Sequence, residues 1–261
     1  MLDNIATLDT LKIEIKEGIL YMGLNRPEKR NAFNDTLIKS IEKVFDNLPQ
    51  DVKCIIIYGI GKHFSAGLDL SELTQLDVVE GLYHSRMWHT VMDKIQFGKV
   101  PVIAALHGAT VGGGLEMATA CHLRVADSSA FFALPEGQRG IFVGGGASVR
   151  LPKLIGMARM ADMMLTGRVF TAAEGEQIGL VNYMVDADKA LEKCEELAKK
   201  IISNAEITNY AVMHILPRIT DSNQSEGLLM ESLIAAITSS SPEAKQRLND
   251  FLEGRGKKVG E

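Results

Sequence analysis

Two glutamates are candidates for acid–base chemistry because carboxylates are scarce around them. Residues 94–161 contain three carboxylates, Glu116, Asp127 and Glu136, whereas the average of 33 Asp and Glu in 261 residues would place about nine in a stretch of that length. Burying an unpaired charge is costly, so a carboxylate in such a stretch is paired, lies on an exposed edge or is kept for its chemistry. The chemistry in question is general acid–base catalysis.

Glu116 follows a loop rich in glycine. In the segment HGATVGGGLEMATA (residues 107–120), an apolar run ends at Gly108, three glycines follow at 112–114, and a helix-compatible run begins. Glycines let a ligand approach the backbone, and the N–H groups at a helix N-terminus stabilise negative charge. The segment therefore indicates an anion-receiving loop, although a plain strand-to-helix turn with a glutamate in the first helical turn also fits it.

Several better-known catalytic and binding motifs are not present. Met117 stands where a dinucleotide-binding loop needs its third glycine, and His63 stands where a P-loop needs Ser or Thr. Ser65 lacks the preceding glycine of a hydrolase elbow. His84 and His89 are five residues apart without the HExxH pattern, so no metal site is predicted.

The elements that must position these groups are those of an α/β protein. Strands separated by helices require crossover connections, which predict a mainly parallel sheet. The pattern predicts a hairpin over residues 11–24, helices over 34–48 and 84–95, and strands over 54–58, 100–106, 123–126 and 180–185.

The last third of the chain changes character. Glycine becomes rare after about residue 186, and four segments have helical periodicity: 187–204, 205–216, 224–239 and 242–252. We therefore predict an α/β core over residues 1–185 and a helical region over 186–261. Apolar helix faces in that region serve either assembly or packing against the core.

Composition narrows the class of protein. A 46% apolar and 23% charged chain is typical of a globular protein, and the net charge of −5 gives no general attraction to nucleic acid or an anionic membrane. The three cysteines have no CxxC spacing, and the N-terminal residues lack a basic targeting pattern. We expect a cytoplasmic protein with no membrane or nucleic-acid partner.

Five segments together resemble the crotonase, or enoyl-CoA hydratase/isomerase, superfamily. They occur in the family's order and spacing: NRPEKRNA (25–32), HFSAGLDL (63–70), HGATVGGGLEMATACHLRVAD (107–127), FALPEGQRGI (132–141) and LTGRVFTAAEGEQIGLVN (165–182). The resemblance implies a crotonase-like spiral of ββα units with a C-terminal helical trimerisation region, assembled as a trimer or a dimer of trimers.

The resemblance also assigns site residues. Ala66 and Gly113 match the positions whose backbone N–H groups form an oxyanion hole for the thioester oxygen. Glu116 and Glu136 match the two glutamates that hydratases use around a water molecule, and the resemblance leaves open which is the acid. The implied coenzyme A (CoA) contacts are Lys29, Ala32, Ser65, Ala66, Gly67, Leu68 and Asp69. The basic tail (Arg255, Lys257, Lys258) would reach a CoA phosphate or remain solvated.

The acyl pocket is the least defined part of this assignment. Trp88, Phe142 and Gly144 are candidates for its wall, although an aromatic residue at helical spacing also suits core packing. The chain departs from many family members at Phe142–Val143, where a proline is common at the second position, and at His122, where an aspartate is common.

The resulting hypothesis is an enzyme that hydrates an acyl-CoA substrate, a 2-enoyl-CoA hydratase. It needs no metal or redox cofactor, since CoA enters only as part of the substrate. The alternatives are double-bond isomerisation, a hydratase-lyase or thioester-cleaving activity in the same site, and a non-catalytic acyl-CoA-binding protein. Fold similarity alone would not separate them.

Overall fold

A six-stranded sheet forms the centre of the fold, and it is parallel except at one edge. Its strand order is β1-β2-β3-β4-β6-β9. The hairpin pairs β1 (Leu11–Lys16) with β2 (Ile19–Leu24) around Glu17 and Gly18, both of which have positive φ. The strands β3 (Cys54–Gly59), β4 (Val102–Leu106), β6 (Leu123–Asp127) and β9 (Tyr183–Val185) then follow in parallel register. The mainly parallel α/β fold predicted from the sequence is confirmed.

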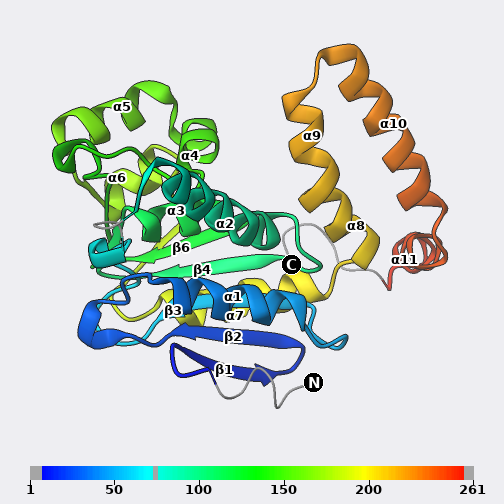
Figure 1. Ribbon diagram of the computed structural model, residues 1–261. Coiled ribbons are helices and arrows are strands. Elements are labelled where there is room, and N and C mark those ends of the chain that lie inside the picture. Colours follow the sequence, from blue (N-terminus) through cyan, green and yellow to red (C-terminus); the bar gives the residue numbers. More distant parts are fainter. Residues whose placement is uncertain (1–7, 73–75, 256–261) are drawn as a thin grey trace. The chain divides into compact units, whose positions relative to one another are not determined.

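The computed structural model describes residues 8–72 and 76–255 (Figure 1). Two compact units divide the chain between Lys199 and Lys200. This division falls inside the last helix of the first unit, α7 (Ala190–Ile202), whereas the sequence pattern placed the start of the helical region at residue 186.

A second, smaller sheet was not predicted. It consists of β5 (Ala109–Val111), β7 (Phe131–Ala133) and β8 (Phe170–Thr171) in the order β5-β7-β8. Strands of two or three residues are too short to show an alternating pattern, so periodicity alone could not find them. The sheet is important because β5 leads into the glycine loop and β7 leads towards Glu136.

Helix α1 (Asp35–Asp46) confirms the predicted helix and its cap, since the Asn34 side chain accepts a hydrogen bond from the Leu37 N–H at 3.0 Å. Helix α2 (Val78–Gln96) begins six residues before the predicted start at 84. Its first turns are stabilised by a capping box between Asp77 and Glu80. Val78 and Val79 are exposed, so no buried periodicity marks this end of the helix.

Short helices complete the first unit, and in Figure 1 helices α4, α5 and α6 lie near one another beyond β6. Their bounds are α3 (Gly113–Ala120), α4 (Ala147–Ile155), α5 (Met157–Thr166) and α6 (Ala172–Gln177). Three 3₁₀ turns cover Pro27–Lys29, Leu70–Glu72 and Gly137–Arg139.

The second unit is helical, as the sequence predicted. It contains α8 (Glu206–Tyr210), a π-helical turn (Ala211–Ile215), α9 (Leu216–Asp221), α10 (Gln224–Ser240) and α11 (Pro242–Leu252). The helix predicted over 205–216 instead continues to Asp221, because Pro217 lies in the first turn of α9, where its missing N–H costs nothing. Among the described residues, no helix has the length and apolar character needed to cross a membrane.

Candidate active site

A cavity of about 320 Å³ in the first unit brings together most of the predicted site residues. The predicted residues on its wall are Ala66, Gly67, Leu68, Trp88, Gly113, Glu116, Glu136, Phe142 and Gly144. Four others, Lys29, Ala32, Ser65 and Asp69, are not on the wall. In the described part of the chain, no three His, Cys, Asp or Glu side chains gather as metal ligands would.

One backbone donor at this cavity belongs to Leu68. The Phe33 N–H donates to the Gly67 carbonyl oxygen at 2.7 Å, and the Asp69 N–H donates to the Phe33 carbonyl oxygen at 2.8 Å. A trans peptide directs its C=O and N–H to opposite sides, so the Leu68 N–H points away from Phe33. Among the described residues it has no hydrogen-bond partner.

The assignment of Ala66 to the oxyanion hole is therefore wrong. Its N–H donates to the Arg30 carbonyl oxygen at 2.9 Å, so this donor is already engaged within the chain. Leu68, two residues later, supplies the available N–H. The sequence motif named the Ala66 peptide, whereas the N–H of this loop without a described partner is that of Leu68.

The second donor is the N–H of Gly113, the first residue of α3. Gly112 has a φ of 52°, and its carbonyl oxygen accepts the Glu116 N–H at 2.9 Å. The following N–H, that of Gly113, therefore points out of the helix N-terminus, and no described residue accepts it.

The loops that carry the two donors are in close contact. A Cβ atom added at Gly67, whose φ is 91°, would lie 2.6 Å from the Val111 carbonyl oxygen and 3.1 Å from the Gly113 nitrogen. Glycine is needed at Gly67 both for its backbone conformation and for this approach. Two N–H groups without an acceptor among the described residues thus belong to neighbouring loops that line the cavity.

Glu116 lies in the first turn of α3 and is 4% exposed. Its Oε1 accepts the N–H of Gly145 at 2.8 Å and that of Ala147 at 3.1 Å. Burial raises its pKa, while the backbone hydrogen bonds and the positive charge of Arg150 act to lower it. These contacts favour the ionised carboxylate within a site that otherwise disfavours charge.

Glu136 has a different environment. It is 7% exposed, lies between β7 and a 3₁₀ turn, and its buried Oε2 has no hydrogen-bond partner among the described residues. Burial, with a smaller contribution from the nearby Glu116 charge, raises its pKa to about 7. At neutral pH this carboxyl group is thus divided between its protonated and ionised forms.

The predicted residues away from the cavity wall have structural contacts. The Ser65 hydroxyl donates to the Asn31 carbonyl oxygen at 2.8 Å and accepts the Gly67 N–H at 3.1 Å. Asp69 forms an ion pair with Arg26 at 3.2 Å, which with the Ser71 hydrogen bond lowers its pKa.

Lys29 lies in the exposed 3₁₀ turn Pro27–Lys29, and the Ala32 N–H donates to its carbonyl oxygen at 3.0 Å. In the second unit, Arg255 pairs with Asp250 at 2.7 Å. Lys257 and Lys258 lie outside the described residues.

The acyl-wall candidates differ in burial. Trp88 is 3% exposed and its ring packs 5.6 Å from that of Phe33, whereas Phe142 is 68% exposed. Val143, which stands where a proline is common, is buried at the same wall. His122 stands apart from the cavity, where its Nδ1 accepts the Val102 N–H at 3.0 Å and its Nε2 lies 3.0 Å from the Gln96 carbonyl oxygen.

Other wall residues were missed by the sequence analysis: Leu70, Gly81, His84, Ser85, Arg139, Ile141 and Gly145. The sequence analysis had noted Gly112 in the glycine loop and Val143 as a departure at the pocket, and both also lie on the wall. Three of the missed residues share one face of α2 with Trp88, since Gly81, His84, Ser85 and Trp88 are spaced i, i+3, i+4 and i+7. That spacing was visible in the sequence. It was not informative by itself, because the face carries mostly small or polar side chains.

Comparisons with known proteins identify the family of the chain. The model of the enoyl-CoA hydratase/isomerase family matches residues 14–260. The short-chain-enoyl-CoA hydratase of Clostridium acetobutylicum is 32% identical over 244 residues, covering 92% of this chain and 94% of that protein.

Two crystal structures have the same fold over nearly the whole chain. A Rhodopseudomonas palustris protein provisionally described as an enoyl-CoA hydratase is 54% identical, with a TM-score of 0.92 and coverage of 94% of this chain and 95% of that one. The enoyl-CoA hydratase of Bacillus anthracis is 29% identical, with a TM-score of 0.88 and coverage of 97% and 100%.

Proposed function

The chain belongs to the enoyl-CoA hydratase/isomerase family, and from this premise we propose that it adds water across the conjugated double bond of a 2-enoyl-CoA thioester. One observation carries the proposal: both glutamates line a cavity whose wall also includes Leu68 and Gly113, two residues whose N–H groups have no acceptor in the described part of the chain. Isomerisation needs one base to move one proton, whereas hydration has separate work for two carboxyl groups.

The Leu68 and Gly113 N–H groups would hold the thioester oxygen. Addition at the β-carbon moves electrons onto that oxygen, so hydrogen bonds to it strengthen as the enolate forms. Gly113 begins α3, and the positive end of the helix dipole adds to the stabilisation. Both donors are fixed before substrate arrives, because the preceding carbonyl oxygens are already hydrogen bonded.

We assign the base to Glu116 and the acid to Glu136. In this assignment Glu116, whose carboxylate form is stabilised by two backbone N–H groups, takes a proton from water as the water oxygen bonds to the β-carbon. Glu136, protonated, gives its proton to the α-carbon as the enolate collapses. One water adds to the substrate, and proton exchange between the two carboxyl groups or with solvent restores the starting state.

The test uses crotonyl-CoA and follows the loss of its conjugated enoyl-thioester absorbance. We expect turnover by the wild type and a loss of at least about 10²-fold in kcat for both Glu116→Gln and Glu136→Gln. Product analysis distinguishes hydration from isomerisation or cleavage. Tight binding without turnover of crotonyl-CoA, 3-enoyl-CoA or branched thioesters would overturn the proposal in favour of a binding protein.

The CoA portion is proposed to follow the segment of residues 29–32 and the loop of residues 65–69. The Ala66–Arg30 hydrogen bond supports this path, because it brings the two segments side by side at the cavity. Lys29 is exposed there and would supply a positive charge for a phosphate.

Assembly as a trimer or a dimer of trimers is also a proposal. It is supported by the second unit, in which α10 exposes Leu229, Leu233 and Ile237 at four-residue intervals.

We propose a cytoplasmic location as well, supported by three cysteines that are all buried and free.

A further inference from the structure

Glu116 is held by a loop that has almost no side chains of its own. The loop of residues 144–147 reads Gly-Gly-Gly-Ala, and its N–H groups at Gly145 and Ala147 both reach Glu116 Oε1. Three successive glycines make a flexible segment, which would lose these hydrogen bonds readily if nothing fixed it. The contacts that fix the loop come from α2 and α4.

The first contact is made by Ser85, which lies in the middle of α2. Its hydroxyl donates to the Gly144 carbonyl oxygen at 2.7 Å. The same peptide carries the Gly145 N–H on its opposite side, and that N–H donates to Glu116 Oε1 at 2.8 Å. Ser85 and Glu116 are thus connected through a single planar peptide.

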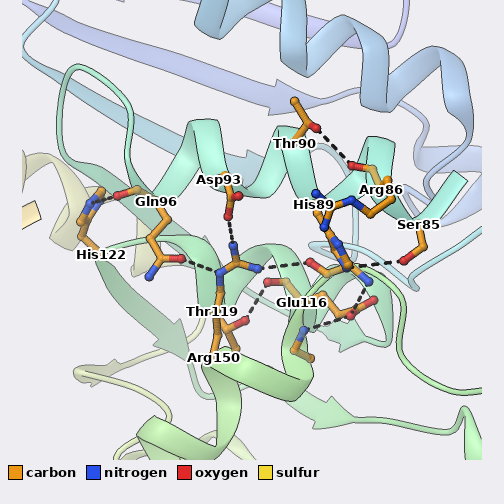
Figure 2. A network of polar contacts seen from close by, with 12 residues as sticks. Ser85, Arg86, His89, Thr90, Asp93, Gln96, Glu116, Thr119, His122 and Arg150 are labelled. Carbon is orange, nitrogen blue, oxygen red and sulfur yellow. Dashed lines mark hydrogen bonds and ion pairs between the residues drawn. The ribbon is translucent and has the colours of Figure 1, made fainter. Parts of the chain in front are cut away.

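The second contact is made by Arg150 on α4, which is 8% exposed (Figure 2). Its Nη1 donates to the Gly145 carbonyl oxygen at 3.3 Å, which fixes the next peptide of the loop. Two groups on α2 hold the guanidinium in place: Asp93 accepts Nη2 at 2.7 Å, and the Gln96 side chain accepts Nε at 2.6 Å.

We propose that Ser85 and Arg150 are positioning residues for hydration: they fix the loop of residues 144–147 so that its N–H groups keep Glu116 ionised and oriented towards the attacking water. The inference rests on the proposed function. It adds a role for α2 beyond lining the cavity, because this helix anchors the loop directly through Ser85 and indirectly through Asp93 and Gln96.

The charged and titratable groups around Glu116 define what a pH measurement reports. Arg150 faces it from α4, Glu136 from the turn after β7, and Asp93 on α2 pairs with Arg150. His89 on α2 lies 3.4 Å from the Ser85 hydroxyl. Loss of backbone hydrogen bonds to a carboxylate raises its pKa, so loosening the loop moves the Glu116 titration to higher pH.

The first experiment compares Ser85→Ala with Ser85→Thr, which keeps the hydroxyl. The matched control is Thr90→Val, because the Thr90 hydroxyl lies on the same helix and bonds only to the Arg86 carbonyl oxygen on the other side of α2 in Figure 2. For Ser85→Ala we expect kcat with crotonyl-CoA to fall at least about tenfold, with KM within about threefold of wild type.

The pH profile separates positioning from loss of folded protein. The acid limb of kcat/KM should move to higher pH in Ser85→Ala and Arg150→Met, and remain in place in Ser85→Thr and Thr90→Val. A variant that merely unfolds more easily would lose amplitude without moving this limb. Unchanged kcat and an unchanged acid limb in Ser85→Ala would overturn the inference.

A measurement without turnover keeps the two proposals distinguishable. Infrared titration of the carboxyl band that disappears in Glu116→Gln reports the Glu116 pKa directly. A shift of that band to higher pH in Ser85→Ala supports the positioning role even if crotonyl-CoA is not hydrated, whereas turnover with no shift would refute the positioning role alone.

Discussion

The two glutamates share a cavity, but their oxygens have different partners. Glu116 Oε1 accepts two backbone N–H groups, whereas Glu136 Oε2 is buried and finds no partner in residues 8–72 and 76–255. Hydrogen bonds to the charged form stabilise it, and burial without them favours the neutral form. In the proposed function, this contrast rather than residue type would allow two identical side chains to act as base and acid.

The first prediction concerns pH. Because Glu136 must be protonated to deliver a proton and its pKa is about 7, kcat/KM should fall as pH rises through this value. The measurement is the rate of crotonyl-CoA hydration between pH 5 and 9 at constant ionic strength. A rate that stays constant up to pH 9 would contradict the role of Glu136 as the acid.

The second prediction concerns stability. The pKa of Glu136 is raised from 4.5 to about 7 by burial, so the native state binds more protons than the unfolded state between these values. Stability from this group is therefore present below pH 4.5 and is lost as pH rises to about 7, amounting to up to about 3 kcal/mol. Glu136→Gln should unfold at higher urea concentration than wild type at pH 8.

The same comparison at pH 4.5 provides the internal control, since Glu136 is then protonated in the native state and only half ionised in the unfolded state, so little of the pH-dependent difference remains. The difference in urea midpoint between Glu136→Gln and wild type should be smaller at pH 4.5 than at pH 8. A second control is Glu192→Gln, an exposed position on α7. Its urea midpoint should differ from that of wild type by the same amount at both pH values. An equal gain at pH 4.5 and pH 8 would refute the linkage.

At the scale of elements, the long periodic segments were predictable and the short ones were not. The hairpin, α1 and the strands β3, β4 and β6 were found because each has enough residues to show its period. The strands β5, β7 and β8 have two or three residues each, and their pairing depends on contacts far along the chain.

The oxyanion donor shows the same limit within the site. The motif named a loop, but the direction of the Leu68 N–H in it depends on the bond between the Phe33 N–H and the Gly67 carbonyl oxygen. Phe33 and Gly67 are far apart in sequence. Because every residue except proline carries a backbone N–H, the residue type does not reveal which N–H acts as a donor. The two glutamates, in contrast, were predictable because carboxylates are rare in their surroundings.

The third prediction tests the close approach of these loops. In Gly67→Ala, a Cβ atom would lie 2.6 Å from the Val111 carbonyl oxygen, so the loops must separate and the donors at Leu68 and Gly113 must move apart. We expect kcat with crotonyl-CoA to fall about 10²-fold or more. The matched control is Gly156→Ala, a position that also has positive φ but nothing within 4 Å of the added atom.

Gly156→Ala should lose about 1 kcal/mol of stability from backbone strain and keep its activity. Circular dichroism and urea unfolding show whether Gly67→Ala is folded under the assay conditions. A folded Gly67→Ala enzyme with wild-type kcat would mean that the Leu68 and Gly113 donors do not act together.

At the scale of the whole molecule, the second unit exposes a row of large apolar side chains on α10. Leu228, Leu229, Leu233 and Ile237 on α10 are each more than half exposed. Exposed apolar patches of this kind mark interaction sites. The sequence predicted the helices of this unit from their periodicity, but could not specify what covers their apolar faces.

The fourth prediction places a charge in this surface. Leu233→Asp should convert the proposed assembly into smaller species, because burying an unpaired carboxylate at an interface is unfavourable. Sedimentation velocity at several protein concentrations measures the effect. The control is Glu243→Lys on α11, an already exposed charged position. An unchanged sedimentation coefficient in Leu233→Asp would show that this face is not an interface.

Leu68 has two roles that are chemically independent. Its N–H is a proposed oxyanion donor whose direction is set by the peptide before it, while the residue lines the cavity and its side chain packs against the hydrophobic core. Any residue other than proline supplies an N–H, so mutation can change the shape of the pocket at this position and leave the catalytic hydrogen bond in place. Under the proposed function, single substitutions at Leu68 would therefore change the acyl preference of the site and leave its oxyanion donor unaltered.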